Sequence, residues 1–148
     1  MKTLFTAFKG TNNTSFQLVS QLGENSIFLT NSFQGLEKDI AFIAFEYNAA
    51  IMLGVDKTLN DKIRIETCAK YNQDLLYSNF NITSLENKLE DFKISYTTSS
   101  KPTNYLCNAA YYHMLKKNSN TIFIHIPSIR GMNENLMNLL VEFLDTLQ

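Results

Sequence analysis

One cysteine of the sequence stands where a reactive thiol is favoured. Cys107 follows Pro102 by five residues and lies near the start of an apolar segment that predicts a helix over residues 101–117. Peptide dipoles at a helix N-terminus stabilise the thiolate and lower the pKa of a cysteine there. Cys107 is therefore a candidate nucleophile for covalent catalysis. The structural alternative also stands, because free cysteines often serve as small buried hydrophobes.

A histidine can supply the base that such a nucleophile needs. His125 lies in the run FIHIP at residues 123–127, which predicts a buried strand that ends at the proline. The other histidine, His113, follows Cys107 by six residues on the same predicted helix. At 100° per residue it lies nearly on the opposite face, so it cannot be the partner. His125 is the candidate base, and a buried histidine with a structural role is the alternative.

Length and composition predict one domain over residues 1–148, with 45% hydrophobic residues and a net charge of −1. With two arginines and no basic stripe, no nucleic-acid partner is expected. The two cysteines and two histidines are too scattered for a zinc site, so no metal, cofactor or disulfide is expected. No apolar run approaches about 20 residues, and residues 1–9 are too short for a signal peptide. We therefore expect a cytoplasmic protein without membrane contact; a homo-oligomer is compatible with this composition.

Apolar runs alternate with helical patterns along the chain. Strands are expected at residues 4–8, 27–30, 49–55, 62–69, 92–96 and 121–126. Helices are expected at residues 16–22, 32–47, 101–117 and 133–147, and residues 74–91 are expected to form a loop with a short helix at 85–91. This order predicts an α/β fold, a three-layer α/β/α sandwich with a mixed, mostly parallel sheet. Functional groups in such folds gather at the carboxyl ends of strands, where His125 lies.

A carboxylate near the predicted strand at 62–69 can complete the set. A catalytic histidine needs an acceptor that holds its ring in the correct tautomer. Glu66 lies near the middle or end of that strand and can take this role. On the residues alone, the exposed face of an edge strand is the simpler explanation of Glu66. Cys68, two residues further on, is expected to be a core or half-buried residue without chemistry.

Four segments, taken in chain order, carry motifs of a known family. Residues 4–8 (LFTAF) with 13–16 (NTSF) are similar to L-x-T-G-F and N-P-S-W, and residues 63–69 (IRIETCA) are similar to I-T-I-E-R-x-A. Residues 105–115 (YLCNAAYYHML) resemble Y-V-C-N-x-x-x-Y-x-x-L, and residues 123–127 match F-I-H-V/I-P. These motifs belong to pyroglutamyl peptidase I, also called pyrrolidone-carboxylate peptidase. The resemblance covers nearly the whole chain, and its last two segments are the specific ones.

The resemblance implies a cysteine peptidase with a triad of Glu66, Cys107 and His125. Such an enzyme removes an N-terminal pyroglutamyl or similar residue from a small peptide or amide substrate and needs no cofactor. The resemblance also implies that Phe8, which matches the first of two stacking phenylalanines, and Asn13 bind substrate.

The motifs for substrate recognition depart from the family pattern. The glycine-rich G-Q-A-G-G-R ahead of the Glu strand is replaced by residues 54–61 (GVDKTLND), and the first loop is cut to residues 9–12 without the second phenylalanine. Residues 102–103 (PT) replace A-G, residues 75–77 replace an expected arginine, and the chain is shorter than family members. Two alternatives remain: a same-triad amidohydrolase for another small or N-blocked amide, and a non-enzymatic binding or assembly module. The residues do not identify the oxyanion donor.

Overall fold

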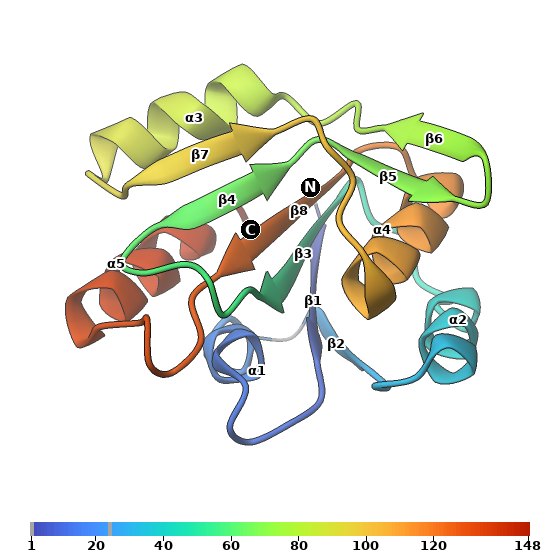
Figure 1. Cartoon of the computed structure of the whole chain (residues 1–148), viewed down its shortest axis with the longest axis horizontal. Helices are drawn as coiled ribbons and strands as arrows, with labels where there is room; N and C mark the ends of the chain where they lie inside the picture. Colours follow the sequence, from blue (N-terminus) through green and yellow to red (C-terminus); the bar gives the residue numbers. More distant parts are fainter. Residues whose placement is uncertain (1, 24) are drawn as a thin grey trace.

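Six strands form the central sheet of the protein (Figure 1): β1 (Thr3–Phe8), β2 (Ser26–Leu29), β3 (Ala49–Val55), β4 (Ile63–Glu66), β7 (Tyr96–Ser99) and β8 (Thr121–Ile126). The computed structural model describes residues 2–23 and 25–148. The strands lie in the order β2-β1-β3-β8-β4-β7. The first four of this order are parallel to one another, whereas β4 is antiparallel to β8 and parallel to β7. The expected mixed, mostly parallel sheet is confirmed.

Helices cover both faces of this sheet (Figure 1). One face carries α1 (Thr14–Val19), α3 (Ile82–Asp91) and α5 (Glu134–Asp145), and the other carries α2 (Phe33–Ala41) and α4 (Tyr105–Lys117). Each face has its own cluster of buried apolar side chains. The expected three-layer α/β fold is therefore present. No helix in the described part of the chain is long and apolar enough to cross a membrane.

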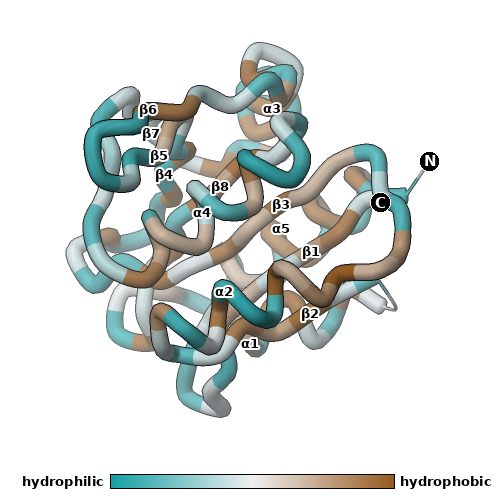
Figure 2. Tube along the Cα trace, turned by 90° about the vertical axis from the view of Figure 1, so that its right-hand side faces the viewer, coloured by the Kyte–Doolittle hydropathy of each residue, from teal (hydrophilic) through white to brown (hydrophobic). Residues whose placement is uncertain are grey.

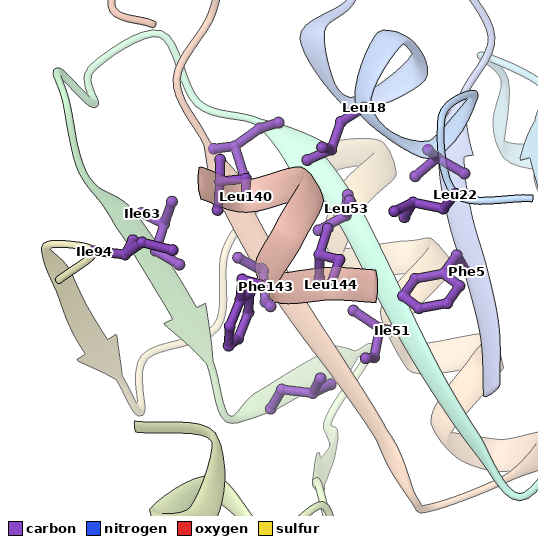
Figure 3. Packing of buried hydrophobic residues seen from close by; sticks show 14 of the residues in the cluster. Phe5, Leu18, Leu22, Ile51, Leu53, Ile63, Ile94, Leu140, Phe143 and Leu144 are labelled. Atoms are coloured by element: carbon purple, nitrogen blue, oxygen red, sulfur yellow. The ribbon is translucent and has the colours of Figure 1, made fainter. Parts of the chain in front are cut away.

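The central strands are apolar on both faces, which is typical of parallel strands between two helical layers. Every residue of β1 and of β8 is buried. On the α5 face, Leu140, Phe143 and Leu144 lie over Ile51 and neighbouring side chains of the sheet (Figure 3). Hydrophobic residues accordingly follow β1, β3 and α5 through the middle of the molecule (Figure 2). The core thus makes the centre of the sheet a rigid platform.

Asparagine side chains begin three of the helices. The side-chain oxygens of Asn13, Asn81 and Asn133 accept hydrogen bonds from backbone N–H groups in the first turns of α1, α3 and α5. Asn104 stands at the same position before α4, but its side chain makes no such bond. The first N–H groups of a helix have no partner inside the helix. The start of α4 therefore keeps backbone donors that the other helices satisfy.

A β-hairpin stands where the sequence predicted one long strand and a loop. The strand expected at 62–69 divides after Glu66, and residues 68–71 form β5 (Cys68–Tyr71), which pairs with β6 (Asp74–Tyr77) in a separate two-stranded sheet. The turn between them places Asn72 at φ 54°. Asparagine tolerates this left-handed conformation better than most residues, which permits a tight turn. The loop predicted for residues 74–77 is therefore wrong.

Three other predicted boundaries are wrong. The helix expected over 32–47 ends at Ala41, and residues 42–48 form the segment that connects it to β3. The strand expected at 92–96 lies instead at 96–99, because Lys93 adopts φ 59° and ends α3. α3 itself begins at Ile82, three residues before the predicted short helix. Such boundaries depend on turn geometry that apolar periodicity does not reveal.

Candidate active site

The antiparallel pairing of β4 and β8 brings three polar side chains to one face of the sheet. Arg64 lies directly opposite His125, and Glu66 lies opposite Phe123. Residues two apart on a strand point to the same face, and so do directly opposed residues on paired strands. Phe123 packs against Tyr111 of α4, so this is the face that α4 covers. β4 is not an edge strand and Glu66 is only 2% exposed, so the explanation of Glu66 as an exposed edge residue is wrong.

His125 and Glu66 form a buried pair. The distance from His125 Nδ1 to Glu66 Oε2 is 2.7 Å, and both side chains are almost fully buried. The Tyr111 hydroxyl donates to the backbone oxygen of Glu66 at 2.7 Å, which fixes the end of β4. His125 Nε2 has no hydrogen-bond partner among the described residues, yet it is not one of the fully buried unpartnered atoms. This nitrogen is therefore free to exchange a proton with a group in the neighbouring cavity.

Arg64 joins the pair to the segment that follows β3. Its Nε donates to Glu66 Oε2 at 2.6 Å, and a terminal nitrogen donates to Asp56 Oδ2 at 2.6 Å. Asp56 also accepts bonds from the backbone N–H and the hydroxyl of Thr58. Partial burial works to raise the pKa of Asp56, but the bonds from Thr58 and Arg64 outweigh it and lower that pKa to about 2. The result is a continuous chain of charged contacts from Asp56 to His125.

Cys107 lies in the first turn of α4, three residues after Asn104, and approaches β3 closely. A Cβ atom placed on Gly54 would come within 2.9 Å of Cys107 Sγ and within 2.7 Å of the Phe123 ring. Gly54 is the residue of β3 that pairs with His125. The sulfur therefore lies over the strand next to the histidine, in a space that any larger residue at position 54 would fill.

The backbone just before Cys107 has an unusual conformation. Tyr105 has φ 63° and is 82% exposed. A tyrosine in the left-handed region carries conformational strain, which native proteins retain mainly at functional sites. The backbone N–H groups of Leu106 and Cys107 donate to no acceptor in the described part of the chain.

The Cys107 thiol is protonated in the resting protein. Burial raises its pKa to about 12, with further contributions from the negative charges of Glu66 and Asp56. The lowered pKa predicted from the helix N-terminus is therefore wrong, because desolvation and two nearby carboxylates outweigh the helix dipole. No hydrogen bond of the described residues joins the sulfur to His125.

Cys107, His125 and Arg64 line one open cavity of about 900 Å³. Its remaining lining comes from the end of β3 and the segment after it, at residues 55–58, and from the segment before α4 with the first residues of that helix, at residues 103–106. Glu66 lies behind His125, outside the lining. In the described part of the chain, no group of three histidine, cysteine or acidic residues is arranged to hold a metal ion.

The two predicted substrate-binding residues do not line this cavity. Phe8 is 5% exposed and packs in the core beside Leu29 and Leu36. In the β1–β3 register Thr6 lies opposite Met52, so Phe8, two residues further on, lies opposite Gly54. Gly54 in turn lies opposite His125, so β3 separates Phe8 from His125. The side-chain oxygen of Asn13 is occupied by the N–H groups that it caps at 2.9 and 3.2 Å.

The remaining sequence predictions about cysteine and histidine are consistent with the structure. Cys68 is buried, is not in a disulfide, and its thiol donates to the Ser100 backbone oxygen at 3.2 Å. His113 packs against the Tyr71 ring, away from the cavity. Arg64, Asp56 and Gly54 were not predicted as site residues. Only Arg64 had a signal in the sequence, since it precedes Glu66 by two residues in an alternating strand and so shares its face.

The fold and the site together define a class: a three-layer α/β protein with a cysteine, a histidine and a buried glutamate around one cavity. Solved structures with this fold include the pyrrolidone carboxyl peptidase from Thermus thermophilus, with a TM-score of 0.78 and 16% identity over 97% of this chain and 98% of that chain. Pyroglutamyl peptidase I from Bacillus amyloliquefaciens gives a TM-score of 0.79 at 17% identity, over 98% and 94% of the two chains. The pyrrolidone carboxyl peptidase from Thermococcus litoralis gives 0.77 at 17% identity, over 99% and 92%.

These similarities extend from end to end of the chains, so the resemblance first read from four motifs is confirmed at the level of the fold. No protein-family model matches the sequence, and no curated protein matches it. The chain therefore has the pyrrolidone carboxyl peptidase fold with a strongly divergent sequence.

Proposed function

We propose that this protein is a cysteine hydrolase of the pyroglutamyl peptidase type, which cleaves the amide bond after an N-terminal pyroglutamyl or similar blocked residue. The observation that carries the proposal is the buried His125–Glu66 pair, joined at 2.7 Å, beside a cavity that Cys107 also lines. Burying charged groups is costly, and a cluster of buried titratable groups at a cavity is characteristic of active sites. The cytoplasmic location remains part of this proposal.

In the proposed reaction, Cys107 Sγ attacks the carbonyl carbon of the scissile amide while His125 Nε2 takes the thiol proton. The resulting tetrahedral oxyanion collapses, the carbon–nitrogen bond breaks, and His125 gives the proton to the leaving amine nitrogen. The acyl group remains on the sulfur as a thioester. Water then attacks the thioester carbonyl, and its proton passes through His125 back to the sulfur. Glu66 orients the ring through Nδ1 and stabilises the transient imidazolium.

The start of α4 supplies donors for the oxyanion. The amide N–H groups of Leu106 and Cys107 have no acceptor among the described residues, and the Asn104 side chain does not cap them. Backbone donors at a helix start carry partial positive charge and need no reorganisation when the oxyanion forms. We assign the oxyanion site to these two groups.

Recognition of a pyroglutamyl ring is expected to be weak in this protein. The segment that replaces the glycine-rich loop has its Asp56 engaged with Thr58 and Arg64, while Phe8 and Asn13 lie outside the cavity. Poor substrate positioning can lower a rate by ~10²-fold even when the catalytic groups are intact. We therefore expect kcat/KM for a pyroglutamyl amide to lie below ~10⁴ M⁻¹s⁻¹, the lower range of ordinary enzymes.

A panel of fluorogenic amides tests the proposal. The panel holds pyroglutamyl, other N-acylated and unblocked aminoacyl amides, assayed with the wild-type protein and with Cys107→Ala. Cysteine-dependent release from the pyroglutamyl amide, alone or together with other blocked amides, supports the proposal. Cysteine-dependent release that leaves the pyroglutamyl amide intact, whether from another N-acylated amide or from an unblocked one, would instead support the amidohydrolase alternative. No release from any amide, together with an unreactive Cys107, would support the binding or assembly module and overturn the proposal.

A further inference from the structure

The Arg64 guanidinium and the His125 imidazole approach a single oxygen of Glu66. Glu66 Oε2 receives Arg64 Nε at 2.6 Å and His125 Nδ1 at 2.7 Å, while its other carboxylate oxygen is buried without a partner. One oxygen therefore separates the guanidinium from the imidazole. At such short range a fixed positive charge disfavours protonation of a neighbouring ring.

The position of this arginine is a feature of this chain. The related motif reads I-T-I-E-R, with threonine two residues before the glutamate and arginine directly after it. Here Arg64 stands in the place of that threonine, and Thr67 stands in the place of that arginine. Neighbouring residues on a strand point to opposite faces, whereas residues two apart share a face. The exchange thus brings an arginine to the face that holds Glu66 and the cavity.

We propose that Arg64 is a positioning residue for the catalytic pair: it holds Glu66 in place against His125, and its positive charge opposes protonation of the His125 ring, which as a base must accept a proton. The inference deepens the proposed function and rests on it for the role of His125 as base. A buried carboxylate alone favours the imidazolium, and an imidazolium cannot take the proton of a thiol. Arg64 offsets part of that effect.

Several charged or titratable groups surround His125 and Glu66, and each influences the protonation of His125. Glu66 of β4 contacts His125 directly, and Arg64 binds the same carboxylate oxygen. Cys107, Asp56 and Lys57 line the same cavity as His125, and Tyr111 of α4 donates to the backbone oxygen of Glu66. Asp56 is bound to the far end of the Arg64 guanidinium, so it neutralises part of the arginine charge. Removing Asp56 and removing Arg64 should therefore have opposite effects on the protonation of His125.

The test is an NMR titration of the two histidine rings in the full chain, assigned with a His113→Gln variant. In Arg64→Gln, the protonation midpoint of His125 should move to higher pH by about one unit. In Asp56→Asn it should move by a smaller amount to lower pH. Arg64→Lys keeps the charge and should stay near the wild type. His113 lies outside the network and serves as the internal reference, and Arg130→Gln is the matched arginine control.

The proposal is supported if the protonation midpoint of His125 moves to higher pH in Arg64→Gln and to lower pH in Asp56→Asn, while the midpoint of His113 stays unchanged. An unchanged His125 midpoint in folded Arg64→Gln overturns it. If Arg64→Gln does not fold, Asp56→Asn provides the test. The proposal is then overturned if the protonation midpoint of His125 in Asp56→Asn does not move to lower pH. The titration needs no substrate, so a protein that hydrolyses no amide would refute the proposed function without changing this result.

The acid limb of the kcat/KM profile provides a second measurement where activity is found. It should move in the same direction as the NMR midpoint in each variant. A purely structural role of Arg64 would lower activity at every pH without moving that limb.

Discussion

Two regions of the molecule differ in the partners of their polar side chains. Across β3, β8 and β4, the polar groups bind one another beside the Cys107 sulfur: His125 holds Glu66, and Cys107 lies over the neighbouring Gly54. In the segments after β1 and β3, polar groups mainly satisfy local backbone. Asn13 caps α1, and Asp56 binds the N–H of Thr58. The first region has the composition of a catalytic centre, whereas the second has that of well-ordered connecting segments.

Under the proposed function, the first region carries the chemistry, and the connecting segments that line the cavity carry substrate recognition. We call Cys107, His125 and Glu66 the catalytic row of the proposed function. The strands beneath these residues are held by two buried clusters, one on each face of the sheet. The connecting segments are held mainly by their own hydrogen bonds. Changes in the row should therefore affect the chemical step, whereas changes in the segments should affect stability and binding.

The largest expected effect is at the nucleophile. Cys107→Ala removes the attacking atom and should lower kcat/KM roughly 10⁴-fold or more for any amide that the protein cleaves. Cys68→Ala is the matched control, because that thiol is buried and bound to Ser100. Initial rates over a substrate series measure both variants. Substantial activity remaining in Cys107→Ala would show that Cys107 is not the nucleophile.

The next effect concerns the carboxylate behind the histidine. Glu66→Gln keeps the shape of the side chain but removes the charge that orients and stabilises the imidazolium, so kcat should fall roughly 10³-fold. Glu90→Gln, at an exposed carboxylate bound to the Tyr96 hydroxyl, is the control. Steady-state kinetics should place the loss in kcat rather than in KM. A loss confined to KM would assign Glu66 to substrate binding instead.

A smaller, graded effect is expected for alkylation of the thiol. Because burial and two carboxylates raise the pKa of Cys107 to about 12, its thiolate fraction should grow about tenfold per pH unit from neutral pH upward. Iodoacetamide labelling, mapped by mass spectrometry, should favour Cys107 over Cys68 and rise steadily to pH 10. A plateau near neutral pH would reveal a thiolate–imidazolium pair and contradict the protonated resting thiol. N-acetylcysteine provides the reference curve.

The smallest effect belongs to the connecting segment. The pKa of Asp56 lies at about 2, below the ordinary 3.8, so this residue stabilises the fold above pH 4 and loses that contribution as pH falls toward 2. Asp56→Asn should lower the free energy of unfolding by about 1–2 kcal/mol near pH 6, with a difference that shrinks in acid. Urea unfolding at several pH values measures it.

Asp91→Asn, at an exposed carboxylate outside the network, is the control for that measurement. Equal pH dependence in the two variants would show that Asp56 does not hold its segment. A loss of activity from Asp56→Asn as large as that from Glu66→Gln would remove the distinction between the two regions.

The sequence predicted the central strands best. β3 and β8 have the bounds expected from their apolar runs, because strands buried on both faces need apolar residues throughout. The hairpin of β5 and β6 was missed, since its strands are short and half-exposed and so lack that signal. The early end of α2 was missed because apolar residues continue past Ala41, and Phe42 is 81% exposed there.

Within the site, sequence and structure contributed different information. Residue types, spacing and motif resemblance singled out Cys107, His125 and Glu66, because such chemistry requires particular side chains in particular local contexts. Phe8 and Asn13 were chosen by motif alone, and the structure places neither at the cavity.

The sequence by itself determined the alternation of strands and helices, the apolar central strands and the choice of three candidate catalytic side chains. Only the tertiary structure decided that β4 runs antiparallel to β8, which brings Arg64 and Glu66 to His125. It also decided that the Cys107 thiol is protonated, because burial and the charges of residues far along the chain set its pKa. Local pattern reflects hydrophobic periodicity, whereas pairing direction and electrostatics arise from contacts between distant segments.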